Sequence, residues 1–134
     1  MAEDYFDAAK RHLHDAKLLR SQITPCLENA SHLAGISAEC AMKAILQHYS
    51  NAVQVKKHLP DMWQHFACHP AMSRRSGLRS RIAEQKESFD QWEIGQRYEA
   101  RGAAFFEIGV VDVQLAAAGA LVSFSHQAKA GTHI

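Results

Sequence analysis

The stretch from Pro25 to Ser50 constrains the fold more than any other part of the sequence. Its apolar and small residues form two rows at spacings of three or four, so the apolar surface is wider than the stripe of a surface helix. A helix of this kind lies at the centre of a bundle and is covered on more than one side. Gly35 within it costs about 1 kcal/mol relative to alanine, so we expect it to allow a neighbour to approach closely.

Composition favours the same fold class. The chain of 134 residues has 22 alanines, whereas valine, isoleucine and threonine together number 15. Alanine favours helices and β-branched residues favour strands, and 7 glycines with 3 prolines are too few for a β-sandwich or barrel. We therefore predict one all-α domain over residues 1–134: an up-and-down bundle of four to five helices with a decorated crossover segment.

The first helix is predicted over residues 4–22, because apolar residues recur on one face and continue to Ile23. Thr24 is a suitable N-cap for the central helix, and Pro25 suits its first position.

The crossover segment contains weaker helical patterns. A short helix is expected over residues 59–69 and is ended by Pro70, since proline lacks the amide that would continue it. Residues 71–89 favour a helix-rich excursion, and residues 91–102 an ordered loop. The excursion carries a thin apolar stripe: Leu78, Ile82 and Phe89.

The last periodic stretch, residues 103–128, predicts a helix whose inward face begins at Ile108. Glu107, Asp112 and Gln114 interrupt its apolar run, and a membrane-spanning helix would bury them at considerable cost. The acidic start of the chain lacks the basic and apolar regions of a signal peptide. Three cysteines form neither a CxxC pair nor an even disulfide set. We expect a cytoplasmic protein with free thiols and no membrane segment.

Several segments together resemble a known family. The central helix reads ASHLAGISAECAMKAIL, a basic connector leads to His58-Leu59-Pro60, and WEIGQRY precedes the final apolar helix. This pattern is similar to that of HEPN-domain proteins, helical-bundle modules of prokaryotic defence, toxin–antitoxin and nucleotidyltransferase-partner systems. The resemblance implies a dimeric helical module that binds a nucleotide, a nucleic acid or a partner protein.

The resemblance also points to four candidate ligand-binding residues: Glu39, Lys43, Arg97 and Tyr98. An arginine can fork onto a phosphate, and a tyrosine can stack on a base. Structural roles are the alternative. Glu39 and Lys43, four residues apart, would form an ordinary helical ion pair, while Arg97 would cap helix carbonyls and Tyr98 would plug the end of the bundle.

The family's best-known activity is metal-independent RNA cleavage, which uses an arginine followed by four to six residues and a histidine. Such a reaction needs a cation for the charged phosphorane and an imidazole for the 2′-hydroxyl proton. No arginine of this chain has a histidine at that distance; Arg97, for example, is followed there by Gly102, Ala103 and Ala104. We therefore assign no catalytic residue.

Charge is uneven although the formal net charge is only +1. Residues 56–86 carry seven Lys/Arg against Asp61 and Glu84, and residues 87–112 carry six acids against two arginines. The basic part is either a solvated surface or a phosphate-contacting one, since arginine forks match phosphate oxygens. Its candidate nucleic-acid contacts are Arg74, Arg75, Arg79 and Arg81. The opposite polarity of the two parts also suits self-association.

A metal site is not expected. The one metal-like cluster consists of His58, His65, Cys68 and His69, and of these His65 and His69 share a helix face. We predict that His58 caps the short helix or bonds a backbone carbonyl.

These observations predict a catalytically inert, HEPN-like binding module. Its expected ligand or partner is a nucleotide, RNA or another protein, such as a nucleotidyltransferase or a toxin–antitoxin or defence partner, and no cofactor or metal is expected. A homodimer is expected because the central helix is hard to cover in so small a domain. Two alternatives stay open: a divergent ribonuclease pairing Arg97 with His58 or His126, and a purely structural dimeric interaction protein.

Overall fold

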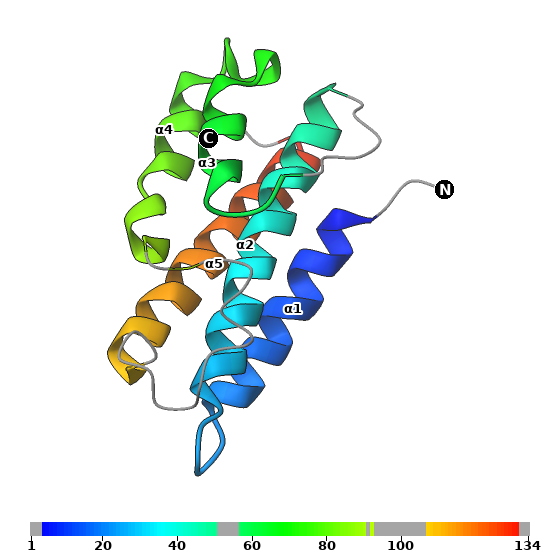
Figure 1. Ribbon diagram of the computed structural model, residues 1–134. Coiled ribbons are helices and arrows are strands. Elements are labelled where there is room, and N and C mark those ends of the chain that lie inside the picture. Colours follow the sequence, from blue (N-terminus) through cyan, green and yellow to red (C-terminus); the bar gives the residue numbers. More distant parts are fainter. Residues whose placement is uncertain (1–3, 51–56, 91, 93–106, 132–134) are drawn as a thin grey trace.

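A computed structural model of the protein describes residues 4–50, 57–90, 92 and 107–131 (Figure 1). Within these residues the chain forms five α-helices and two short 3-10 helices, and it forms no strand. Helices α1, α2 and α5 pack against one another as a bundle, which confirms the predicted all-α class. The α-helices are α1 (Tyr5–Arg20), α2 (Leu27–Ser50), α3 (Asp61–Cys68), α4 (Ser76–Ala83) and α5 (Ile108–Lys129).

Helix α1 begins after Asp4, whose carboxylate caps it by accepting a hydrogen bond from the Asp7 amide at 2.9 Å. Its buried positions have helical spacing: Tyr5, Ala9, Leu13 and Ala16. The expected continuation of this face to Ile23 is wrong. The helix ends at Arg20, so Ile23 lies in the following turn and is fully exposed.

Helix α2 runs antiparallel to α1 and buries 14 of its 24 residues, as its wide apolar surface predicts (Figure 1). It begins at Leu27, so Thr24 is not its N-cap and Pro25 does not occupy its first position. The reason lies in the turn between the helices. The Cys26 amide donates to the Leu19 carbonyl at 3.2 Å, which holds the chain outside the helix until Leu27.

Helix α5 runs in the same direction as α2 (Figure 1). Residues 103–106 of its predicted range lie outside the described residues. The Ile108 side chain is 47% exposed, which corrects the expectation that it faces the core. As the first residue of the helix it precedes the inward face, which begins at Val111. A buried hydrogen bond of 2.6 Å from the Ser31 hydroxyl to Gln114 Oε1 joins α5 to α2.

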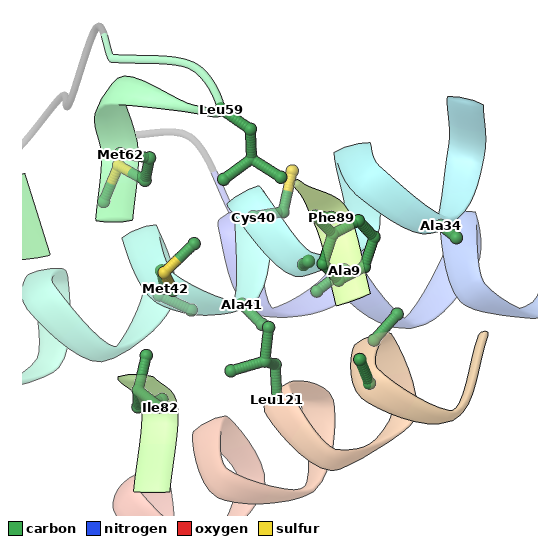
Figure 2. Close-up of a cluster of buried hydrophobic side chains, with 14 of the residues drawn as sticks. Ala9, Ala34, Cys40, Ala41, Met42, Leu59, Met62, Ile82, Phe89 and Leu121 are labelled. Atoms are coloured by element: carbon green, nitrogen blue, oxygen red, sulfur yellow. The ribbon is translucent and has the colours of Figure 1, made fainter. Parts of the chain in front are cut away.

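The return path between α2 and α5 carries the shorter helices. The predicted short helix is confirmed as α3, and Pro70 ends it and opens the 3-10 helix η1 (Pro70–Met72). Helix α4 and the 3-10 helix η2 (Lys86–Phe89) follow. The predicted apolar stripe of this segment is confirmed, because Leu78, Ile82 and Phe89 are all buried. Figure 2 shows the shared core, in which Met42 of α2 lies with Met62, Ile82 and Leu121.

The apolar surface of α2 is covered within one chain. Helices α1 and α5 contact it along its length, and α3 and η1 contact it from the return segment. The physical reason for expecting a dimer, an uncovered central helix, is therefore not met. Large apolar side chains that remain exposed on a described helix include three at the start of α5: Ile108, Val110 and Val113.

Helix α5 is long and apolar enough to cross a membrane by length and composition alone. Glu107 was expected to interrupt the apolar run of this helix, but it precedes the helix, so Asp112 and Gln114 remain as the predicted interruptions. In the structure α5 packs against α1 and α2, and about a third of its apolar window is buried. The cytoplasmic location stays a prediction.

Candidate functional site

Glu39 and Lys43 form a buried ion pair in the middle of α2. They are four residues apart, so they share one face of the helix, and Lys43 Nζ lies 3.1 Å from Glu39 Oε2. Their residues are only 3% and 5% exposed, respectively. The sequence predicts the pairing, whereas the burial follows from the cover that other elements provide.

The Glu39 carboxylate has two further donors, both from the chain entering α3. His58 Nδ1 lies 3.0 Å from Glu39 Oε2, and the Leu59 amide donates to Glu39 Oε1 at 2.9 Å. Because an ionised carboxylate only accepts hydrogen bonds, His58 Nδ1 must carry the proton of that contact. Three donors compensate the desolvation of the buried charge. Glu39 therefore fixes the start of the return segment to the centre of the bundle.

Lys43 adds helix α1 to this cluster. Its Nζ lies 5.5 Å from the centre of the Tyr5 ring, within the range of a cation–π contact. Tyr5 is itself 7% exposed. Because its ammonium pairs with Glu39 and lies over the Tyr5 ring, Lys43 links α2 to α1.

His58 is the exposed member of the cluster. Its side chain is 55% exposed, although Nδ1 is held by buried Glu39. The prediction that this side chain caps a helix or bonds a backbone carbonyl is wrong; it is the His58 carbonyl that accepts the Met62 amide at the start of α3. Nothing in the sequence signals a contact between residues 19 positions apart.

Trp92 packs against α2 at Gly35, one helical turn before Glu39. Its indole Nε1 donates to the Ser31 carbonyl at 2.8 Å, and its ring stacks on His32 with centroids 5.9 Å apart. The ring lies directly against Gly35, where a Cβ atom would overlap it. This contact explains the glycine in the middle of α2, as expected from the sequence.

Two of the four predicted ligand-binding residues, Glu39 and Lys43, are thus brought together and buried. The other two, Arg97 and Tyr98, lie outside the described residues. Trp92, the described residue nearest to them on the N-terminal side, packs against α2 at Gly35.

The four candidate arginines have different surroundings. The Arg75 guanidinium lies 3.8 Å from the centre of the Tyr49 ring and donates to the Ala71 carbonyl at 2.7 Å. Arg74, Arg79 and Arg81 are exposed. Two residues of separation place Arg79 and Arg81 about 200° apart around α4. The basic segment therefore presents cations in several directions, and its contact with nucleic acid stays a prediction.

Two histidines lie close together at the end of α3. His65 and His69 have ring centroids 5.6 Å apart, and His69 Nδ1 accepts the Ala71 amide at 3.1 Å. Burial, with nearby His69 and Lys57, lowers the pKa of His65. Over the described part of the chain, no group of three metal-ligating side chains occurs. The three cysteines, Cys26, Cys40 and Cys68, are free thiols.

Comparison with known proteins gives no match to a family model, a curated protein or a solved structure. The chemistry of the site must therefore be argued from its own geometry. The cluster contains one saturated carboxylate, one covered ammonium and one half-exposed imidazole. The imidazole is the part that can reach a ligand or a proton in solution.

Proposed function

We propose that this protein is a catalytically inert, HEPN-like binding module that acts in the cytoplasm with a nucleotide, RNA or a partner protein. The observation that carries the proposal is that the buried Glu39 carboxylate is held by three partners: Lys43, His58 and the Leu59 amide. The Glu39 side chain is buried and both of its oxygens are engaged, so it is not placed to reach a proton on a bound substrate.

The ligand would contact the edge of this cluster and not its interior. His58 offers a donor or acceptor at the surface, while Arg97 and Tyr98 supply the phosphate fork and the stacking ring that the family resemblance implies. Glu39 and Lys43 then act through His58 and the chain entering α3, so the buried pair has a positioning role and does not touch the ligand.

Two measurements test the proposal. Purified protein is incubated with structured and single-stranded RNA in a chelator, and we expect no cleavage. A thermal-shift screen with nucleotides and short RNAs should find a ligand that raises Tm, and Arg97→Ala should remove that shift without lowering the Tm of the free protein. RNA cleavage by the wild-type protein that is lost in Arg97→Ala would contradict the proposal. So would a screen in which no compound raises the Tm.

A divergent ribonuclease is the second candidate function, favoured by the His58–Glu39 contact. The contact of Nδ1 with a buried carboxylate orients the half-exposed ring, the arrangement that acid–base catalysis by an imidazole requires. In that case His58→Gln would abolish RNA cleavage while leaving the protein folded. Cleavage retained in this variant would eliminate His58 as the base.

A further inference from the structure

A small apolar cleft lies between α3 and α4, which run side by side on the outside of the bundle (Figure 1). Its volume is about 240 Å³, and its lining surface is almost entirely apolar. Trp63 and Phe66 of α3 and Ile82 of α4 are among the lining residues, and all three are buried. The Trp63 ring is backed by Phe89, with centroids 6.0 Å apart. The cleft is therefore built on packed side chains of the core.

The charged residues among those that line the cleft are both cations. Arg79 and Lys86 both line the cleft and are exposed, and no acidic side chain lines it. Neither cation forms an ion pair with another described residue. The nearest acids in the sequence, Glu84 and Glu87, are exposed but are not lining residues. An apolar floor with a positive rim is complementary to an apolar group flanked by carboxylates.

The size of the cleft selects among ligands of that kind. Pockets for small molecules usually measure about 300–1,000 Å³, and this one is smaller. It suits one large side chain, the anchor that commonly dominates a protein–protein contact. A nucleic-acid base fits poorly, because its polar edges would be buried against apolar atoms without partners.

We propose that the α3–α4 cleft binds an acidic segment of a partner protein, which inserts one large apolar side chain between Trp63 and Ile82 and places carboxylates beside Arg79 and Lys86. An amphipathic helix has this pattern, with an apolar anchor and acids one turn away. The inference deepens the proposed function by giving the partner's chemistry. It rests on the proposed action with a partner protein, and none of the residues lining the cleft is Glu39, Lys43 or His58.

The test uses the full chain and labelled helical peptides of about 14 residues. The first peptide carries a central phenylalanine among glutamates, the second replaces that phenylalanine by alanine, and the third replaces the glutamates by lysines. We expect saturable anisotropy changes with the first peptide only. Added salt should weaken its binding, because the rim charges are exposed.

Variants of the chain locate the contact. The double variant Arg79→Glu/Lys86→Glu should weaken binding of the acidic peptide about tenfold, and Ala83→Phe, which fills the cleft from α4, should abolish it. Arg81→Glu is the matched control: it reverses a charge of the same type on α4 but outside the cleft, and should change binding less than about twofold. Circular dichroism checks that each variant is folded.

Several results would overturn the proposal. The alanine peptide could bind as tightly as the phenylalanine peptide, or Arg81→Glu could weaken binding as much as the double variant, which would indicate charge attraction alone. Tighter binding of octanoate or of a uridine oligonucleotide would assign the cleft to another ligand. A wild-type dimer that Ala83→Phe converts to monomer would assign it to a second copy. None of these outcomes affects the RNA cleavage and nucleotide tests, so the two proposals fail separately.

Discussion

Glu39 forms an ion pair within its own helix and also binds the chain that enters α3. Glu39→Leu would leave the Lys43 ammonium buried without its anion and the Leu59 amide without its acceptor. Removing one member of a buried pair costs about 3–5 kcal/mol, so we expect a loss of that size in the free energy of unfolding, measured by urea denaturation.

The surface offers a matched control for this prediction. Arg11 and Asp7 form an ion pair of the same i,i+4 spacing at 2.9 Å, but both side chains are more than half exposed. Arg11→Gln should therefore cost no more than about 0.5 kcal/mol. The double variant Glu39→Leu/Lys43→Met should recover part of the loss, because it removes both buried charges. Equal effects at the buried and exposed pairs would contradict the role given to Glu39.

Glycine substitutions test the contact between α2 and Trp92. Gly35→Ala adds a methyl group where the indole ring lies, so the ring must move from a site in which it is 1% exposed. We expect a loss of about 1–3 kcal/mol from overpacking, larger than the gain in helix propensity. Gly119→Ala on α5 is the control, since its Cβ meets no atom within 4 Å. That variant should gain up to about 1 kcal/mol; a gain in both would place Trp92 elsewhere.

His12 gives the protein a predictable response to acid. Burial, with a contribution from Arg11, lowers the pKa of His12 below its ordinary value of 6.5. The unfolded chain therefore takes up this proton before the folded chain does, and stability falls as pH drops below 6.5. In His12→Gln the free energy of unfolding should decline less between pH values of about 7 and 5. An unchanged decline would contradict the assignment.

At the scale of elements, the long helices could be predicted and the site largely could not. The central helix could be predicted from apolar spacing, because a helix buried on several sides leaves a strong periodic signal. The pairing of Glu39 with Lys43 was predicted, but its contacts with His58 and Leu59 were missed, since they depend on how the return segment folds back. Ile23 and Ile108 were placed wrongly for a related reason. Periodicity shows which face is apolar, not where the helix stops.

Unequal packing of the elements predicts unequal local stability. Helix α2 is packed on by α1 and α5, whereas α3 and α4 have fewer neighbours. Hydrogen exchange should therefore be slowest in the centre of α2 and faster by a factor of about ten or more in α3 and α4. In Glu39→Leu the start of α3 should exchange faster still, relative to α2, because its anchor is lost. Uniform exchange in all helices would indicate that the return segment unfolds only with the bundle.

At the scale of the whole molecule, the question is which surface a second copy would use. The core of one chain covers α2, so a dimer must draw on apolar surface elsewhere, and α5 exposes Val110 and Val113, which are three residues apart and share one face of the helix. Exposed apolar groups that gather in this way commonly mark contact sites.

If this face forms the expected homodimer, wild-type protein will sediment as a dimer and Val113→Glu as a folded monomer, because a buried carboxylate without a partner is costly. Leu18→Glu, which changes an exposed apolar residue of α1, should leave the dimer intact. A wild-type monomer at all concentrations, or equal effects of the two variants, would mean that the α5 face does not pair copies of this chain.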